Sequence, residues 1–324
     1  MPALLRKGNA LLAAGRATRM GVPKLLLPYT ADQSLLTHAV ATLSRCGEGS
    51  VAVILGHQAA LFREALRGAA KDGLFAANEV HCLYNAQYWQ GLATSLGVAV
   101  SWAEAQQFDG LLLLAADQPF VEVHQLRQLW AVFEKRPSGI HAVAAACGGQ
   151  LRNPAVVDAT FFAPLSASEG DRGARPFLEA HADQVIPVEW GEGPWFEDID
   201  AWPAYVQSVR RGGWGGKPPE VTWLSAPPLS WLRQADRCVH ADPAPRLAPG
   251  TLLVAVPKAW PIAAETLYGV RLPAMAQRVQ ALPETRELLQ QGVDTLLFSA
   301  AQTAAEKLAF VRAAACWALS LQIG

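Results

Sequence analysis

The chain has little net charge, few charged residues and no long apolar run, and each of these shortages excludes a class of protein. Its 324 residues include 27 lysines and arginines against 28 acidic residues, so the formal net charge of −1 gives no reason to expect general nucleic-acid binding. No apolar run approaches the length of a membrane span, and the short run after Arg6 and Lys7 does not fit a signal peptide. We therefore expect a cytoplasmic protein without a nucleic-acid or membrane partner.

Cysteine is scarce as well. The five cysteines are an odd number with no C-x-x-C pair, which favours reduced thiols over disulfides or a metal site. Cys238 and His240 are tempting as metal ligands, but one Cys-x-His pair defines no coordination sphere, and a surface loop is the simpler interpretation. Hydrophobic residues make up 51% of the chain, which is enough for a large core in one or two domains.

Short apolar runs alternate with helical periodicity from residue 8 to about residue 210. After the first run, which ends at Ala13, we expect strands at 51–55, 80–84, 111–115 and 140–146 and helices at 59–70, 92–103 and 123–134. This rhythm predicts an α/β fold with a doubly wound, mainly parallel sheet and helices on both faces. In such sheets, ligands bind beyond the carboxyl ends of the strands.

The composition changes near residue 212. We expect a first domain over residues 1–211, a linker rich in glycine and proline over 212–219, and a smaller C-terminal α/β region of unknown role over 220–324. Within this last region, 251–256 and 294–298 are strand candidates, and 304–319 is an apolar helix candidate.

The most informative segment is the loop after the first apolar run, where cations and glycines gather and no carboxylate precedes Asp32. Glycine backbone together with arginine and lysine forms a cradle for a polyanion, and triphosphate is the obvious candidate. The spacing fits neither the Walker A motif nor the dinucleotide fingerprint. The alternative is a glycine-rich turn with solvated cations. The candidate phosphate-binding residues are Ala13, Ala14, Gly15, Arg19, Gly21 and Lys24.

Asp117 follows the buried run 111–115, at the same predicted sheet edge. A carboxylate beside a triphosphate loop favours Mg²⁺, which binds carboxylate and phosphate oxygens together. The alternative is that Asp117 caps a helix that begins near Val121.

The loop, read as Leu-Ala-Ala-Gly-Arg-Ala-Thr-Arg-Met-Gly-Val-Pro-Lys, resembles the signature of the MobA-like nucleotidyltransferase family. It departs from that signature at Ala17 and Thr18, and within the family it looks most like molybdenum cofactor cytidylyltransferases. The resemblance covers residues 8 to about 207 with five motifs in the expected order. It implies a Rossmann-type fold similar to nucleotide-diphospho-sugar transferases, with Arg19, Lys24 and Asp117 as catalytic residues.

The resemblance implies roles for four further groups of residues. Asp200 aligns with a second metal ligand, although Asp198 is a weaker alternative and Asp200 would equally suit the N-cap of a helix over 201–209. A second group resembles nucleotide-binding positions, with simple turn and cap residues as the alternative. A third resembles acceptor-binding positions, with an exposed basic turn as the alternative. The second group is Asn85, Gly91 and Ser95, and the third is Arg152, Asn153, Gly170, Asp171 and Arg175.

By this resemblance, the protein transfers CMP from CTP to molybdopterin or molybdenum cofactor and releases pyrophosphate, with Mg²⁺ or Mn²⁺ as cofactor. Ala14 stands where guanylyltransferase relatives usually carry a second glycine, which favours CTP over GTP. Three alternatives stay open: a GTP-dependent cofactor form, another acceptor such as a sugar 1-phosphate, and a non-catalytic chaperone that hands the cofactor to a molybdenum hydroxylase apoenzyme.

Overall fold

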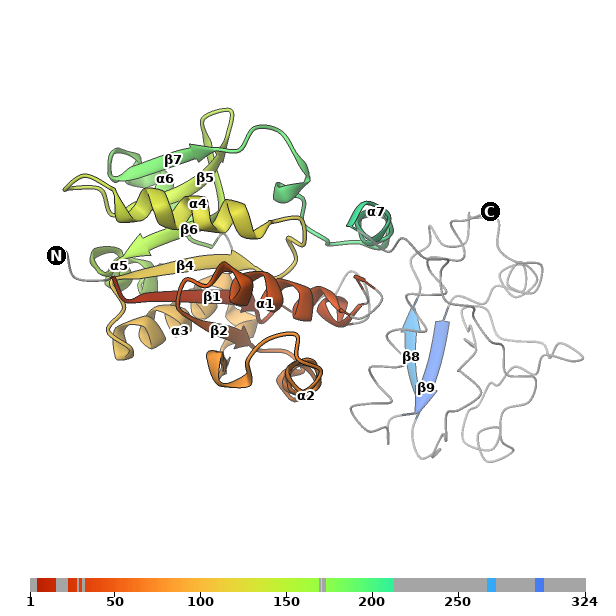
Figure 1. The fold of residues 1–324 in the computed structure, drawn as a ribbon. Coiled ribbons are helices and arrows are strands. Elements are labelled where there is room, and N and C mark those ends of the chain that lie inside the picture. Colours follow the sequence, from red (N-terminus) through yellow and green to blue (C-terminus); the bar gives the residue numbers. More distant parts are fainter. Residues whose placement is uncertain are drawn as a thin grey trace, which may run out of the picture. The chain divides into compact units, whose positions relative to one another are not determined.

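The computed structural model describes residues 5–15, 23–27, 29–30, 33–168, 170, 173–212, 267–271 and 295–299. The chain divides into two units, one of residues 1–16 and 33–198 and the other of residues 17–32 and 199–324, and each is described by itself. The first unit contains a seven-stranded sheet (Figure 1). No helix among the described residues is long and apolar enough to cross a membrane.

The sheet has the strand order β3-β2-β1-β4-β6-β5-β7. The first four strands in chain order pair in parallel, as the alternation of apolar runs and helices predicts, and β1 lies between β2 and β4. Because these four strands point the same way, their carboxyl ends share one edge of the sheet. The strands of this unit are β1 (Lys7–Ala13), β2 (Ser50–Leu55), β3 (Val80–Tyr84), β4 (Gly110–Ala115), β5 (Ala142–Cys147), β6 (Gln150–Asp158) and β7 (Val185–Glu189).

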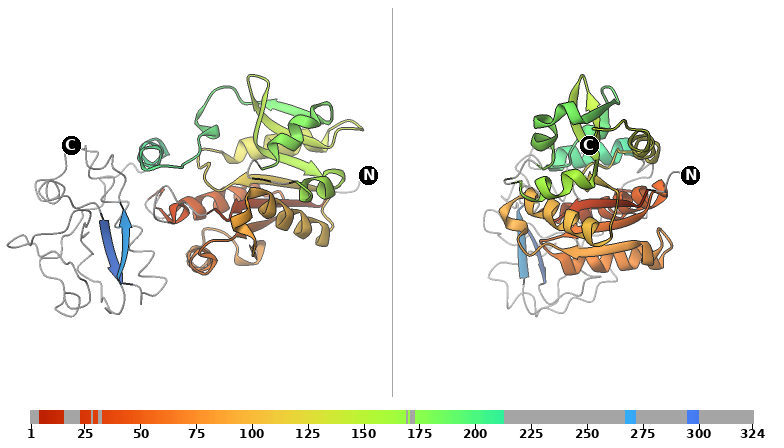
Figure 2. Two further views of the ribbon diagram at one scale, coloured as in Figure 1. Left: turned by 180° about the vertical axis from the view of Figure 1, so that it is seen from behind. Right: turned by 90° about the vertical axis from the view of Figure 1, so that its left-hand side faces the viewer.

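Helices cover both faces of this sheet (Figure 2). Successive residues of β1 show the two faces: Asn9 bonds to Trp130 of α4, whereas Ala10 packs in the cluster that contains Leu96 of α3. The doubly wound prediction is therefore confirmed for this unit. Its helices are α1 (Leu35–Cys46), α2 (Ala59–Lys71), α3 (Leu92–Ala105), α4 (Val123–Glu134), α5 (Phe162–Ser166) and α6 (Arg175–Ala180), with 3₁₀ turns at η2 (Ala77–Glu79), η3 (Tyr88–Gln90), η4 (Ala159–Phe161), η5 (Ala182–Gln184) and η6 (Pro194–Phe196).

The sequence does not predict two strands of this unit, β6 and β7. β6 runs antiparallel to both of its neighbours, β4 and β5, so the segment that carries Arg152 is part of a strand and not a basic turn. Gly148 and Gly149 make the tight connection from β5 at φ values of 57° and 77°, which glycine adopts without strain. The carboxylate of Glu189 accepts hydrogen bonds from both of their N–H groups, at 3.1 and 2.7 Å.

The second unit contains η1 (Lys24–Leu26), α7 (Trp202–Gly212) and an antiparallel pair, β8 (Leu267–Arg271) and β9 (Thr295–Ser299). β9 confirms the predicted strand at 294–298 to within one residue, whereas β8 was not predicted. The expected strand at 251–256 and helix at 304–319 lie outside the described residues, as do residues 213–219 of the expected linker.

Candidate functional site

Four loops leave the parallel strands at the same edge of the sheet. In register, Ala13 at the end of β1 stands opposite Leu55 of β2, and Leu12 stands opposite Ala115 of β4. The N–H of Ala116 donates to the carbonyl oxygen of Leu12 at 3.1 Å, so the loop after β1 and the turn after β4 start side by side. The two predicted phosphate- and metal-binding segments of this unit are thus neighbours.

The loop after β1 begins as backbone and small side chains. Ala13 and Ala14 are buried, and among the described residues a side chain added at Gly15 would meet nothing within 4 Å. Gly56, which follows β2, packs so close that an added Cβ would lie 2.8 Å from the carbonyl oxygen of Ala14. The absence of side chains therefore leaves the backbone of this loop accessible on one side and tightly supported on the other. Arg19 and Gly21 lie outside the described residues.

The turn between β3 and α3 is held by Asn85. Its amide nitrogen donates to the hydroxyls of Thr94 and Ser95 at 2.9 and 3.0 Å, and its oxygen accepts from the N–H of Gln87 at 2.9 Å. Asn85 and Ser95 are each 2% exposed, and among the described residues the hydrogen bonds of the Asn85 side chain all lie within this turn and the start of α3, so these side chains shape the turn. Gly91 stands immediately before α3 with φ 115°, a backbone conformation that favours glycine.

The Asp117-Gln118-Pro119 turn follows β4. Glu122 caps α4 in a capping box with Gln125, so the helix-capping alternative for Asp117 is wrong. His38 of α1 contacts this turn. Its Nε2 lies 3.1 Å from the carbonyl oxygen of Pro119, and its Nδ1 lies 3.0 Å from Oε1 of Gln33. No spacing in the sequence marks His38, since it lies on an ordinary amphipathic helix.

Two predicted site residues meet in the second unit. Nζ of Lys24 lies 2.8 Å from Oδ1 of Asp200, with the lysine side chain 12% and the aspartate side chain 51% exposed. α7 begins at Trp202, so the residue before the helix is Ala201, and the N-cap alternative for Asp200 is wrong by one position. The structure instead pairs this carboxylate with the ammonium group of Lys24.

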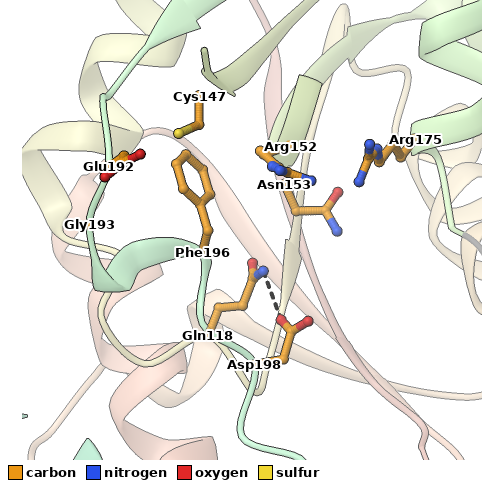
Figure 3. Close-up of a pocket in the computed structure, with 9 residues that line it drawn as sticks. All are labelled: Gln118, Cys147, Arg152, Asn153, Arg175, Glu192, Gly193, Phe196 and Asp198. Atoms are coloured by element: carbon orange, nitrogen blue, oxygen red, sulfur yellow. Dashed lines mark hydrogen bonds between the residues drawn. The ribbon is translucent and has the colours of Figure 1, made fainter. Parts of the chain in front are cut away.

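A polar pocket of about 490 Å³ opens in the first unit (Figure 3). The pocket lies where the pairing of β4 with β6 ends, at Leu113 and Ala155. The next residue of β6 is Pro154, which has no N–H to donate to a neighbouring strand. The pocket is lined by Gln118, Cys147, Arg152, Asn153, Arg175, Glu192, Gly193, Phe196 and Asp198.

Three of the five predicted acceptor-binding residues line this pocket, namely Arg152, Asn153 and Arg175. Gly170 instead accepts a hydrogen bond from the N–H of Ala93 at the start of α3, at 3.1 Å, and Asp171 lies outside the described residues. Of the other pocket residues, only Asp198 has a role predicted from the sequence, as the weaker alternative for the second metal ligand. Gln118 follows Asp117 in the chain without a role of its own, and Glu192 and Phe196 carry no signal in the sequence.

Among the described residues, no group of three or more histidine, cysteine, aspartate and glutamate side chains is arranged to hold a metal ion. The donor set at the strand edge is instead the carboxylate of Asp117 beside a loop suited to phosphates. That combination fits Mg²⁺ or Mn²⁺, which bind through one or two carboxylates and complete their coordination with substrate phosphates and water. Asp200 belongs to the other unit and is described with it.

Two known proteins are similar to this chain in sequence. A relative from Rhodopirellula baltica, named "Probable molybdenum cofactor guanylyltransferase", is 31% identical over 132 residues, which is 41% of this chain and 58% of the relative. The purine catabolism protein PucB of Bacillus subtilis is 30% identical over 216 residues, covering 63% of this chain and 95% of PucB. This chain thus spans little more than half the length of the first of these relatives.

Solved structures resemble the fold. Rv0371c of Mycobacterium tuberculosis H37Rv superposes with a TM-score of 0.51 at 24% identity, covering 64% of this chain and 98% of that chain, and it has also been crystallised with manganese. The family model described as the MobA-like NTP transferase domain matches residues 10–185, which include the end of β1 and the strand edge described above. This chain belongs to the family of MobA-like NTP transferase domains.

Proposed function

We propose that this protein is a nucleotidyltransferase that joins a nucleoside monophosphate, taken from a nucleoside triphosphate, to a phosphorylated acceptor. The observation that carries the proposal is the register between β1 and β4, which sets the backbone of the Ala13–Gly15 loop beside the turn of Asp117. Open backbone for phosphates next to a carboxylate for a divalent cation is what this reaction requires.

The chemistry is an in-line substitution. An oxygen of the acceptor phosphate attacks the α-phosphorus, a new phosphorus–oxygen bond forms, and the bond to the bridging oxygen of pyrophosphate breaks. An acceptor phosphate is already ionised near neutral pH, so the protein needs no general base, and its task is to position the reactants and neutralise charge. In the proposal, the loop backbone, Arg19 and Lys24 bind the triphosphate, and Asn85 with Ser95 acts by holding the neighbouring turn in shape.

A divalent cation is part of the proposal. Asp117 would hold it, with Asp200 as the second carboxylate that the family resemblance implies. When bound, Mg²⁺ or Mn²⁺ supplies positive charge to the phosphate oxygens of the reacting centre. The manganese complex of Rv0371c, a protein with the same fold, supports a divalent metal here.

The pocket of Arg152, Asn153 and Arg175 is the proposed acceptor site. Two guanidinium groups suit a phosphorylated molecule, because arginine binds phosphate through a planar fork of N–H groups. We propose molybdopterin or molybdenum cofactor as the acceptor and CTP as the donor, with Ala14 as the residue that favours CTP. The relative named as a guanylyltransferase makes GTP the competing donor.

Two other functions would use the same pocket. A different phosphorylated acceptor, such as a sugar 1-phosphate, would use the same two arginines. A chaperone that binds the cofactor and delivers it to a molybdenum hydroxylase would use the pocket without the phosphate loop. Pyrophosphate release separates the chaperone from both enzymes, since only transfer produces it.

The first experiment is thermal unfolding with Mg²⁺ and each of CTP, GTP, ATP and UTP. A ligand at 100 times its Kd adds about 2.7 kcal/mol of stability, which a melting curve resolves. Selective stabilisation by CTP, followed by pyrophosphate release on addition of molybdenum cofactor, supports the proposal. A preference for GTP would change the proposed product. If no nucleotide stabilises the protein, the proposal that it is a nucleotidyltransferase is contradicted.

Asp117→Asn tests the carboxylate. We expect the variant to fold and to lose turnover, because the amide keeps the shape of the side chain but not its charge. Asp183→Asn is the matched control, since Asp183 is exposed in η5 and has no proposed role. Full activity in Asp117→Asn contradicts the metal assignment.

The domain division stays a prediction. We propose that residues 1–211 carry the transferase chemistry and that residues 220–324 have a separate role. Expression of residues 1–213 alone tests whether the remainder is needed for folding or for turnover.

A further inference from the structure

Gln118 and Asp198 form a hydrogen-bonded pair at the wall of the pocket, in which Gln118 is buried and Asp198 is exposed. Nε2 of Gln118 donates to Oδ1 of Asp198 at 2.9 Å, across 80 residues of sequence. An ionised carboxylate can only accept hydrogen bonds, so the amide nitrogen must face Asp198 and the amide oxygen must face away from it. The orientation of this amide is therefore set by its partner and is not a free choice.

The amide oxygen has nothing to bond to among the residues that the structure describes. Gln118 is 7% exposed, and its Oε1 is fully buried without a hydrogen-bond partner in that part of the chain. Buried carbonyl oxygens without a hydrogen-bond donor are rare, because burial removes their hydrogen bonds to water and no hydrogen bond within the protein replaces them. Figure 3 shows the amide reaching toward the space between Phe196 and Asn153, inside the pocket.

Other residues of the pocket supply positive charge and an aromatic surface. Arg152 and Arg175 bring two cations, held by Gln150 at 3.0 Å and by Glu179 at 2.7 Å. Phe196 supplies an aromatic wall, and its ring is stacked on Trp190 with centroids 5.7 Å apart and planes at 16°. The pocket therefore suits a molecule with an anionic group, a flat ring and a hydrogen-bond donor.

We propose that Gln118 is a specificity-determining residue: its Oε1 accepts a hydrogen bond from a ring N–H of the acceptor substrate, and Asp198 is the positioning residue that keeps this oxygen turned into the pocket. The inference rests on the proposed function in one respect, that the pocket receives the acceptor. It adds the residue that recognises the ring: the pocket selects a planar heterocycle with N–H donors and an anionic substituent, a description that the proposed molybdopterin acceptor fits. A ring that presents only carbonyl oxygens or C–H groups to Gln118 is disfavoured.

Two probes of similar size isolate this hydrogen bond in the full chain. Pterin-6-carboxylate is a flat two-ring carboxylate with ring and amino N–H donors, and naphthalene-2-carboxylate is a flat two-ring carboxylate with none. We expect the wild-type protein to bind the pterin more tightly by roughly tenfold, the contribution of one well-placed hydrogen bond. The ratio of the two affinities is the readout, because a general disturbance of the pocket weakens both probes alike.

The variants test the two roles separately. Gln118→Leu, or Gln118→Met if the leucine variant folds poorly, should lose the preference. Asp198→Asn should also reduce it, because an asparagine can donate to Oε1 and so allow the amide to turn its nitrogen into the pocket. Adding Asp198→Asn to Gln118→Leu should change the ratio no further, since Asp198 acts through Gln118. Stabilisation by Mg²⁺ and nucleotide serves as the measure of an intact phosphate loop.

The outcomes distinguish this inference from the proposed function. An unchanged ratio in Gln118→Leu, or no preference in the wild type, overturns the role of Gln118 even where nucleotide binding and pyrophosphate release succeed. A further drop in the double variant overturns the positioning role of Asp198. A wild-type preference lost in Gln118→Leu supports the inference even where no nucleotide binds, and in that case the transferase proposal alone falls.

Discussion

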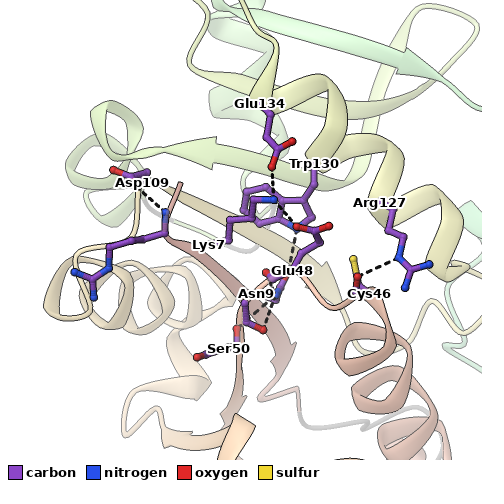
Figure 4. Close-up of polar contacts among 11 residues, drawn as sticks. Lys7, Asn9, Cys46, Glu48, Ser50, Asp109, Arg127, Trp130 and Glu134 are labelled. Atoms are coloured by element: carbon purple, nitrogen blue, oxygen red, sulfur yellow. Dashed lines mark hydrogen bonds and ion pairs between the residues drawn. The ribbon is translucent and has the colours of Figure 1, made fainter. Parts of the chain in front are cut away.

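Asn9 offers a direct test of what holds β1 in the middle of the sheet. Its side chain is fully buried, donates to the carbonyl oxygen of Glu48 at 2.8 Å and accepts from the indole N–H of Trp130 at 3.1 Å (Figure 4). The side chain thus ties the turn before β2 to helix α4 across β1. Lys7 adds ion pairs with Glu48 and Glu134, and although burial lowers the pKa of Lys7, the hydrogen bonds to these two carboxylates outweigh it and raise the pKa overall.

Asn9→Leu keeps the volume but removes the hydrogen bonds to Glu48 and Trp130, together with two longer ones from Nδ2 to the carbonyl oxygens of Gly49 at 3.5 Å and Ser50 at 3.4 Å. Each of the two shorter bonds is worth about 1 kcal/mol, and the indole N–H of Trp130, which is 1% exposed, is left buried without a partner at a further cost of about 1–3 kcal/mol. We expect the free energy of unfolding to fall by about 3 kcal/mol. Urea unfolding followed by far-ultraviolet circular dichroism measures it, with attention to the slope as a check on two-state behaviour.

Trp130→Phe completes a double-mutant cycle. Alone, it should cost about 2 kcal/mol because the oxygen of Asn9 loses its donor. The double variant should cost less than the sum of the two single variants by about 1–2 kcal/mol, since no indole N–H remains to be stranded. Additive losses, or a loss below about 0.5 kcal/mol in Asn9→Leu, would refute the idea that this hydrogen bond matters.

Three further predictions concern other parts of the chain. Gly49→Ala should lower the free energy of unfolding by at least about 2 kcal/mol, because φ is +95° and the new Cβ would lie 2.0 Å from the carbonyl oxygen of Lys7. Gly47→Ala is the control: its φ is +72° and no described atom lies within 4 Å of the new Cβ, so it should cost only about 1 kcal/mol in the same urea assay. Burial raises the pKa of the Cys46 thiol from 9.0 to about 11, so iodoacetamide should not label it in the folded protein at pH 8. Its contribution to stability is present below about pH 9 and is lost as the pH rises toward 11, by on the order of 2 kcal/mol, and Cys46→Ala should flatten that loss. Lys24→Ala should raise the Kd for nucleoside triphosphate in the thermal-shift assay, and unchanged affinity would make Lys24 a structural partner of Asp200 only.

The sequence predicted the structure correctly wherever an element depends on residues close to one another in the chain. The β-branched and apolar runs at 51–55, 80–84 and 111–115 became strands, and the periodic segments between them became helices. It failed at β6, because the polar start of that strand and Pro154 weaken the strand pattern, and the strand is held by pairing on both sides with β4 and β5. Both helix-capping alternatives, at Asp117 and Asp200, failed because helix starts shift by one or two residues with their actual caps.

The sequence by itself indicated the family, the parallel strands and the sheet edge at which candidate site residues lie, because strand period and the pattern of glycines and cations are local properties of the chain. Only the tertiary structure decided which side chains meet: Gln118 reaches Asp198 across 80 residues, and Lys24 reaches Asp200 across 176. It also decided which way the amide of Gln118 points, since that follows from the carboxylate on its other side. Local patterns fix the path of the backbone, whereas the direction of a buried polar group depends on partners that only folding supplies.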